Sequence, residues 1–229
     1  MGHCHPPVRS PPVAATSTLS EAESKRLLAA HGVPVVEERT AADPDTAARA
    51  AEELGYPAVA KLCGPTIAHK TERGLVRLNL SDESAVRAAA AELLDAARPE
   101  DGPVELLVAR MVRGTRELIA GAHRDRQFGP VVMLGIGGVL AEALADVVFR
   151  LLPITRVDAE EMIEDLRTVR LLGPFRGEPP VDRDKLAGVL SGLSGLMESD
   201  DAVLSVDVNP LVVTEGVSVA VDALVEVRG

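Results

Sequence analysis

Three oxygen-bearing side chains interrupt the valine-rich C-terminal run "VLSVDVNPLVVTEGVSVAVD", and their spacing could hold a metal ion. In a β-strand alternate side chains point to the same face, so Asp207 and Asn209 share the face opposite to the flanking valines. If Glu215-Gly216 is a two-residue turn, the returning strand sets Asp222 opposite Asn209. Two carboxylates and an amide oxygen on one patch repel each other unless a hard cation such as Mg²⁺ relieves the repulsion. An ordinary hairpin with a polar outer face fits the same pattern.

A second group of reactive side chains surrounds Lys61, the lone cation in the apolar run "YPAVAKL" at residues 56–62. Burying an unpaired ammonium group is costly, so Lys61 must either reach solvent along its stem or meet an anion. The following loop, "CGPTIAHKTERG", carries His69, Lys70 and Gly74. Basic side chains and glycines on a loop between two strands suit a flap over phosphate groups, although exposed hairpin loops commonly carry the same residues.

A glycine cluster ends the apolar run "QFGPVVMLGIGG" and leads into a predicted helix that carries Glu142. The pattern departs from the dinucleotide-binding motif GxGxxG, because the third glycine is replaced by Leu140. Gly137 and Gly138 still permit the backbone to pass close to a ligand. The cluster therefore predicts a ligand contact without predicting a dinucleotide fold.

The composition excludes several classes of partner. A net charge of −11 argues against nucleic acid and against an anionic membrane, because both require a basic surface. Aromatic residues make up only 2% of the chain, so a bound purine base would lie between aliphatic side chains. No run of 18 apolar residues is present, and two cysteines without a secretory signal predict a cytoplasmic, reducing location.

Helix and strand signals alternate along the chain and predict an α+β fold with two lobes. Ser20 with Glu23 forms a capping box for a helix that ends at Gly32, and Asp43-Pro44 opens a helix that ends at Gly55. A third helix begins after Ser81. Further helices are expected near 139–145, 158–167 and 183–198, and strands at 33–38, 57–62, 74–80, 104–110, 115–122, 130–134 and 147–152.

The expected organisation has three parts. Residues 1–18 form a disordered leader, residues 19–110 form the first lobe with the phosphate loop, and residues 111–229 form the second lobe with the metal site. The strand–linker–strand segment 107–122 joins the lobes, so a ligand in the cleft would touch it.

The order of these motifs resembles the ATP-grasp domain of the ADP-forming acyl-CoA synthetases, the family of the acetate–CoA ligase (ADP-forming) β subunit, and more distantly the succinyl-CoA synthetase β subunit. The resemblance covers residues 20–229. It rests on "AVAKL", "AHKTERG", "RELIAGAHRDRQFGPVVMLGIGGVLAE" and "DVNPLVV" followed by "VD", in family order and close to family spacing. It implies an ATP-grasp fold with ATP or ADP in the cleft between two α+β lobes.

The resemblance also implies roles for individual residues in nucleotide binding. Lys61 would contact the ATP phosphates, Met111 and its neighbours would form the adenine hinge, and Glu117 would meet the ribose. The full expected set of nucleotide-binding residues is Lys61, Gly74, Ala109, Met111, Glu117, Gly137, Gly138 and Glu142. Two positions depart from the family: the second of two glycines is replaced by Leu75, and Ala109 stands where Gln or Glu is frequent.

The chemistry implied by the resemblance is phosphoryl transfer. Asn209 and Asp222, with Asp207, would hold Mg²⁺, and His69 beside Lys70 would carry a phosphoryl group to ADP. A neutral imidazole is nucleophilic near pH 7, which suits it to this relay. The acyl site, the CoA site and a first phosphohistidine would belong to an α-type partner subunit.

Three functions are compatible with this sequence. The first is the nucleotide-binding subunit of an acyl-CoA synthetase that interconverts acyl-CoA, ADP and phosphate with carboxylate, ATP and CoA. The second is a stand-alone ATP-grasp ligase that joins a carboxylate to an amine or a thiol. The third is a non-catalytic nucleotide-sensing subunit, which the changes at Leu75 and Ala109 would suit.

Overall fold

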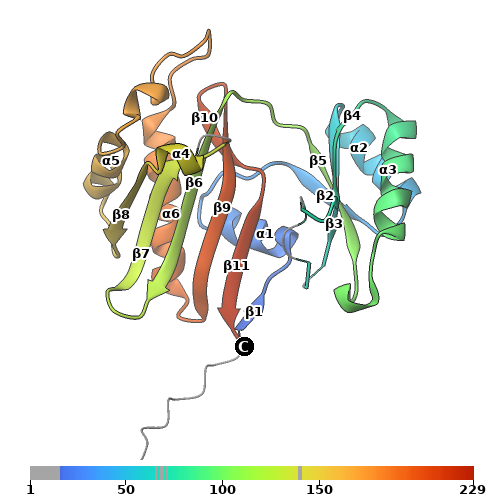
Figure 1. The fold of residues 1–229 in the computed structure, drawn as a ribbon, viewed down its shortest axis with the longest axis horizontal. Helices are drawn as coiled ribbons and strands as arrows, with labels where there is room; N and C mark the ends of the chain where they lie inside the picture. Colours follow the sequence, from blue (N-terminus) through green and yellow to red (C-terminus); the bar gives the residue numbers. More distant parts are fainter. Residues whose placement is uncertain (1–15, 65, 68–69, 71, 139–140) are drawn as a thin grey trace, which may run out of the picture.

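The protein folds into two sheets that lie side by side, each with its own helices (Figure 1). The computed structural model describes residues 16–64, 66–67, 70, 72–138 and 141–229. The larger sheet has seven strands in the order β1-β11-β9-β6-β7-β8, with β10 paired to β9, and the smaller sheet has the order β2-β5-β3-β4. Two mixed lobes of this kind agree with the α+β architecture expected from the sequence.

The smaller lobe is a four-stranded antiparallel sheet covered on its outer side by two helices (Figure 1). An alanine-rich face of the second helix, which Asp43 caps and Pro44 begins, packs on this sheet. The elements are β2 (Glu38–Ala41), α2 (Pro44–Leu54), β3 (Ala58–Cys63), β4 (Val76–Leu80), α3 (Glu83–Asp95), η1 (Pro99–Asp101) and β5 (Glu105–Arg110).

Alternation along β3 places Lys61 on the side facing the larger lobe. Ala58, Ala60 and Leu62 lie in the core under α2 and α3. Lys61 therefore points to the opposite side of the sheet, together with Val59.

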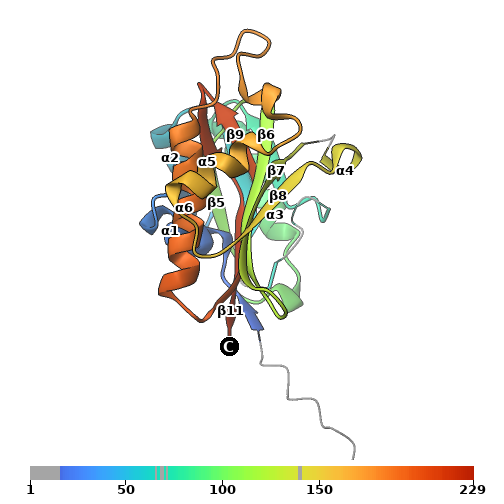
Figure 2. The same ribbon diagram turned by 90° about the vertical axis from the view of Figure 1, so that its left-hand side faces the viewer.

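The larger lobe packs α5 and α6 on one face of its sheet, as the view in Figure 2 shows. Buried leucines of α6 meet valines of the central strand β9 in the main core. The elements are β1 (Thr16–Thr18), α1 (Glu21–Ala30), β6 (Arg116–Asp125), β7 (Gly129–Ile136), α4 (Ala141–Leu144), β8 (Val147–Leu151), α5 (Arg156–Glu164), η2 (Val169–Leu172), α6 (Arg183–Ser199), β9 (Val203–Thr214), β10 (Val217–Ala220) and β11 (Ala223–Arg228).

The lobe boundary predicted at residue 19 is wrong, because α1 belongs to the larger lobe. Leu28 and Val33 lie in the larger core, and Val225 N–H donates to the Ser24 hydroxyl over 3.1 Å. The capping box of Ser20 correctly marks where the helix begins, but local signals do not say which sheet a helix will cover. The smaller lobe begins only at β2.

Two smaller expectations about the N-terminal region also need correction. Thr16–Thr18, expected in a disordered leader, form β1 and pair with β11; residues 1–15 lie outside the described residues. The strand expected at 33–38 is displaced to β2, and the segment before it makes a single parallel bridge between Val35 and Ala220. Pro34, which lacks an N–H donor, limits regular pairing in that segment.

The C-terminal hairpin confirms the predicted register. Val217 pairs with Thr214 around the turn at Glu215-Gly216, and both turn residues have positive φ angles of 50° and 81°. Ala223 of β11 pairs with Val208 in the same register, so Asp222 falls opposite Asn209. The returning strand is interrupted between β10 and β11, and Asp222 lies at that interruption.

The linker between β5 and β6 packs tightly on the end of β9. A Cβ atom added at Gly114 would lie 2.0 Å from the carbonyl oxygen of Val213, which no side chain can tolerate. Gly114→Ala should therefore lower the free energy of unfolding by about 1–3 kcal/mol or more, as overpacking does. Denaturant unfolding followed by circular dichroism measures this change.

Gly188→Ala is the matched control for this substitution. Gly188 lies on the exposed side of α6 with nothing within 4 Å of an added Cβ atom. The control should raise the free energy of unfolding by about 0.5–1 kcal/mol, since alanine is the better helix former. Equal stability of Gly114→Ala and the parent protein would show that the linker does not pack as described.

Candidate functional site

A cavity of about 350 Å³ lies between the two lobes and gathers five of the residues expected to bind nucleotide or metal. Aliphatic side chains form its walls, among them Val36, Val59, Val76 and Val112. Such walls suit a flat apolar group such as a purine base. The expected site residues that line the cavity are Lys61, Ala109, Met111, Glu117 and Asp222.

The interlobe linker supplies one side of this cavity. Met111 N–H donates to the carbonyl of Pro57 over 3.0 Å, and Arg110 N–H donates to the carbonyl of Glu37 over 3.3 Å. These bonds attach the start of the linker to the smaller lobe. Ala109 is buried next to Val59 in the sheet, so the small side chain at this position fits the packing of β5 against β3.

Lys61 is held by the larger lobe at the floor of the cavity. Its Nζ donates to Glu21 Oε1 over 2.6 Å and to the carbonyl of Val221 over 2.9 Å. The nearest carboxylate oxygen of Asp222 lies 3.8 Å away. Lys61 therefore meets an anion, which was one of the two alternatives left open by its apolar surroundings.

Lys70 comes to the same place from the following loop. Its Nζ donates to Glu21 Oε2 over 2.7 Å and lies 3.8 Å from Asp222 Oδ1. Burial alone would lower the pKa of Lys70, but the negative charges of Glu21 and Asp222 raise it, so the ammonium form is kept. The structure thus brings two cations to Glu21 and Asp222, and Asp222 lines the cavity.

Glu21 is the residue that sequence reasoning missed. Its side chain is fully buried, and burial would raise its pKa, but Lys61, Lys25 and Lys70 together hold that pKa far below the ordinary value. The i, i+4 spacing of Glu21 and Lys25 on α1 was a visible signal, yet surface ion pairs commonly show it. Nothing local indicates that a helix start will meet a strand 40 residues away.

The loop between β3 and β4 is fixed near the start of β4 by a bidentate ion pair. Arg73 donates to both carboxylate oxygens of Asp101 over 2.7 and 2.8 Å, and these bonds lower the pKa of Asp101 to about 2. Arg73 is therefore engaged away from the cavity. Gly74 has a positive φ of 67°, and Leu75 is a buried core residue whose N–H donates to the Lys70 carbonyl over 2.8 Å.

His69 lies outside the described residues, so its expected role as phosphoryl carrier stays a prediction. The described part of the loop places Lys70 beside Asp222 and Leu75 in the core. Leu75, at the position where the resemblance leads to the expectation of a second glycine, packs in the smaller core.

The glycine cluster contacts Glu117 through the backbone. Gly137 N–H donates to the Glu117 carbonyl over 2.8 Å, and a Cβ atom added at Gly138 would lie 3.5 Å from Glu117 Oε2. A second hollow of about 420 Å³ is lined by Glu117, Gly137 and Gly138 on its side of the cluster. Glu117 therefore lines both hollows. Glu142 lies in α4, and its side chain is outside the described part of the structure.

Two of the three expected metal ligands lie on β9 of the larger sheet, and the third lies between β10 and β11. Asp207 and Asn209 are exposed on β9, and Asp222 is about one third exposed opposite Asn209. Desolvation by the surrounding protein, and then the negative charge of Asp222, raise the pKa of Asp207. Desolvation also raises the pKa of Asp222. A site that disfavours two negative charges becomes favourable when a cation binds.

These donors fit Mg²⁺ better than a metal enclosed entirely by protein. Within the described residues, no group of three or more His, Cys, Asp and Glu side chains gathers in a way that could hold a metal ion. Mg²⁺ commonly takes one or two carboxylates and completes its shell with water and phosphate oxygens. Asp207, Asn209 and Asp222 offer two carboxylates and one amide oxygen for this purpose.

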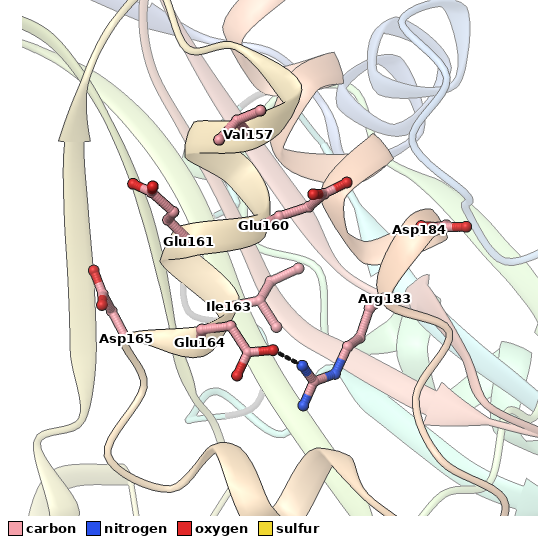
Figure 3. Close-up of a pocket in the computed structure, with 8 residues that line it drawn as sticks. All are labelled: Val157, Glu160, Glu161, Ile163, Glu164, Asp165, Arg183 and Asp184. Atoms are coloured by element: carbon pink, nitrogen blue, oxygen red, sulfur yellow. Dashed lines mark ion pairs between the residues drawn. The ribbon is translucent and has the colours of Figure 1, made fainter.

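A further hollow of about 650 Å³, between α5 and α6, has the wrong charge for a nucleotide (Figure 3). Arg183 pairs with Glu164 there, which neutralises the one cation among the lining residues. Arg150 and Arg156 pair with Asp165, Glu160 and Asp184, but carboxylates still outnumber cations there and would repel phosphate groups. The acidic lining residues are Glu160, Glu161, Glu164, Asp165 and Asp184.

None of the helices in the described part of the chain has the length and apolar character that crossing a lipid bilayer requires.

Comparison with known proteins agrees with the expected family. Residues 13–227 match the family described as the ATP-grasp domain. The chain is 37% identical over 208 residues to the acetate–CoA ligase (ADP-forming) I subunit beta of Pyrococcus furiosus, and the match covers 90% of each protein. It is 30% identical to the succinate–CoA ligase (ADP-forming) subunit beta of Natronomonas pharaonis, covering 91% of this chain and 55% of that protein.

The solved structures show the same fold. The dinucleotide-forming acetyl-coenzyme A synthetase 1 of Ca. Korarchaeum cryptofilum superposes with a TM-score of 0.86 at 34% identity, covering 93% of this chain and 94% of that one. The fold is therefore the ATP-grasp fold that the motif order implied. In other relatives the chain spans only 29% to 31% of the length.

The match over nearly the whole chain, the identity of 37% and the shared fold lead to one conclusion. The chain belongs to the ATP-grasp family and, within it, to the β-type subunits of the ADP-forming acyl-CoA synthetases.

Proposed function

We propose that this chain is the nucleotide-binding half of an enzyme that interconverts acyl-CoA, ADP and phosphate with carboxylate, ATP and CoA. The observation that carries the proposal is the interlobe cavity, where Lys61, Met111 and Glu117 line one space together with Asp222. An aliphatic wall, a linker backbone and a cationic floor match the base, sugar and phosphate groups of an adenine nucleotide.

The base would lie against the linker and the phosphates would lie at the cationic floor. Met111 and Ala109 are at the linker end of the cavity, and Glu117, the second residue of the adjoining strand β6, would meet a ribose hydroxyl. Lys61 would offset charge on the phosphate oxygens. Gly74, Gly137, Gly138 and Glu142 are proposed to complete the nucleotide site.

Mg²⁺ is proposed as the second cofactor, with Asp207, Asn209 and Asp222 as its protein ligands. A solved complex of the Korarchaeum relative contains Mg-AMPPCP. When bound, Mg²⁺ would neutralise phosphate charge during transfer. The described donor set suits this ion because phosphate oxygens would fill the positions that the protein leaves open.

The proposed chemistry transfers one phosphoryl group along a relay. Phosphate displaces CoA from acyl-CoA to give acyl phosphate and free CoA, and a histidine of the partner then takes the phosphoryl group and releases the carboxylate. His69 takes the group from that histidine, and the terminal phosphate oxygen of ADP attacks it to give ATP and the free imidazole. Lys70, next to His69 in sequence, would offset the negative charge of the transferred group.

We further propose that the partner is an α-type subunit that carries the CoA site and the first phosphohistidine. The match covers 90% of a relative whose name identifies it as a β subunit, and longer relatives contain this module as about 30% of their chains. The remaining length in those relatives can supply the acyl and CoA sites. The identity of the acyl group is determined by that partner.

The chain alone should bind adenine nucleotide and show no measurable acyl-CoA synthesis, because the cavity accounts for the nucleotide only. Calorimetry with MgADP tests the binding, and a coupled assay for CoA consumption tests the turnover. Co-purification of the untagged chain from its native cells identifies the partner, whose addition should restore turnover. CoA-dependent ATP hydrolysis by the isolated chain would contradict the proposal and favour a stand-alone ligase.

A further inference from the structure

A buried group of charged side chains joins the two lobes beneath the interlobe cavity. Glu21 and Lys25 come from α1 of the larger lobe, and Lys61 comes from β3 of the smaller lobe. Lys70 comes from the loop before β4, and Glu38 from β2, both in the smaller lobe. Charge pairs in this group therefore run from one lobe to the other.

Glu21 lies at the centre of this group and contacts all three lysines. Its Oε1 is 2.6 Å from Lys61 Nζ and 2.8 Å from Lys25 Nζ, and its Oε2 is 2.7 Å from Lys70 Nζ. The Glu21 side chain has no exposed surface. Because water cannot reach this carboxylate, it depends on the three lysines to offset its charge.

Glu21 determines how Lys61 faces the cavity. An ammonium group has three N–H donors. For Lys61, one goes to Glu21 and a second goes to the Val221 carbonyl at 2.9 Å, both in the larger lobe. The third donor is left for the cavity, which Lys61 lines together with Asp222.

The same carboxylate brings Lys70 to the side of Lys61. Two ammonium groups repel each other, and their approach is favourable only because one carboxylate oxygen binds each of them. Without Glu21, the closest remaining carboxylate among the described contacts of these lysines is Asp222, at 3.8 Å from each. Both lysines would then turn toward Asp222, which is a proposed metal ligand.

We propose that Glu21 is a positioning residue that directs the ammonium groups of Lys61 and Lys70 toward the nucleotide phosphates and keeps them from pairing with Asp222. The inference rests on the proposed nucleotide site and adds a residue of α1 to it. Because α1 belongs to the larger lobe, Glu21 also links the lobe with the lysines to the lobe with the metal ligands.

Replacing a residue that only stabilises the fold would lower the affinity for all ligands alike. Replacing Glu21 should lower the affinity only for ligands that carry phosphate groups. We therefore compare the affinities for MgATP, MgADP and adenosine in the parent and in Glu21→Gln. Calorimetry measures the two nucleotides, and competition against MgADP measures adenosine. Glu21→Gln should weaken MgATP and MgADP by about tenfold or more, since it removes charge-assisted contacts, and should change adenosine by less than twofold.

Glu38→Gln is the matched control. Glu38 also forms a carboxylate–lysine pair between the lobes, with Lys25, but it does not bond to Lys61 or Lys70. The control should leave the ratio of MgATP affinity to adenosine affinity unchanged, whatever it does to the melting temperature. A changed ratio in Glu38→Gln would overturn the specific role given to Glu21.

A double-mutant cycle tests whether Glu21 acts through the lysines. Glu21→Gln made on the background of Lys61→Met should weaken MgATP by a smaller factor than it does in the parent. If Glu21→Gln does not fold, Glu21→Asp replaces it, because aspartate keeps the charge but is one methylene too short to reach both lysines. The same selective loss of phosphate-bearing ligands is expected for Glu21→Asp.

Three further results would overturn the inference. Unchanged MgATP affinity would show that the lysines need no anchor, and equal weakening of MgATP and adenosine would show a purely structural role. Tighter MgATP binding would show that Glu21 competes with phosphate instead of directing the lysines. Absence of nucleotide binding in the parent would instead contradict the proposed function, so the two failures are distinguishable.

Discussion

His69→Ala should abolish phosphoryl transfer through this chain, by about 10⁴-fold or more, while MgADP affinity stays within about twofold of the parent. The physical reason is that the imidazole is proposed to act as a covalent carrier and not as a binding group. Cations that would hold the phosphates come from Lys61 and Lys70, which remain in the variant. A loss of turnover without a loss of affinity is the signature of a missing covalent step.

The measurement is a phosphoryl-labelling experiment with the chain, its partner and a labelled phosphoryl donor. A phosphohistidine is acid-labile and base-stable, so label with these properties should appear on this chain in the parent and be missing in His69→Ala. His123→Ala is the control. His123 is about half exposed on β6, 3.9 Å from Asp125, and is not among the residues that line the interlobe cavity.

Label that persists on His69→Ala would place the carrier elsewhere, and label lost in His123→Ala would do the same. If the parent chain binds nucleotide but takes up no label, the alternative of a nucleotide-sensing subunit would be supported.

Sequence reasoning succeeded where the determining interactions are local in the chain. The turn at Glu215-Gly216 is marked by a glycine, which adopts a positive φ angle without strain, and it fixes the register from Thr214 back to Asp207. Because side chains alternate along a strand, that register was enough to place Asp222 opposite Asn209. The helices that Ser20 and Asp43 cap were likewise predicted from these residues.

It failed where a segment chooses between two possible packing partners. The helix that begins after Ser20 could have covered either sheet, since both cores are aliphatic. What decides the outcome is the fit of Leu28 and Val33 into the larger core, together with the bond between Ser24 and Val225. Contacts between residues that lie 201 positions apart leave no periodic signal in one sequence.

The site shows the same division. Lys61 was identified because a cation in an apolar strand must find an anion, but its partner Glu21 could not be named from the sequence. The reason is topological: Glu21 meets Lys61 only because α1 crosses to the larger lobe and faces the open side of β3. One error about the lobe boundary therefore concealed one residue of the site.

Asp222→Asn should weaken MgADP binding by about 10- to 100-fold while leaving metal-free ADP binding unchanged or tighter. Asp222 lies at the interruption between β10 and β11, opposite Asn209, where its carboxylate can reach a metal ion. In the absence of Mg²⁺ its negative charge repels the phosphates. Removing that charge therefore has opposite effects in the presence and absence of the ion.

Calorimetric titration with ADP, in excess Mg²⁺ and again in excess EDTA, measures both effects on one protein. Asn209→Ala should show the same loss with Mg²⁺ but no gain in EDTA, because an amide carries no charge. Asp201→Asn is the control: Asp201 is 93% exposed at the turn before β9 and pairs with Arg124, so its removal should change neither titration.

The ratio of the two affinities decides the assignment. A metal ligand changes the ratio of MgADP affinity to metal-free ADP affinity, whereas a residue that only supports the hairpin lowers both affinities together. Asp222 also lies 3.8 Å from Lys61 and from Lys70, so a third reading is that it serves only as their counter-ion. In that case Asp222→Asn would tighten ADP binding with and without Mg²⁺, and Asp207 and Asn209 would have to hold the ion without it.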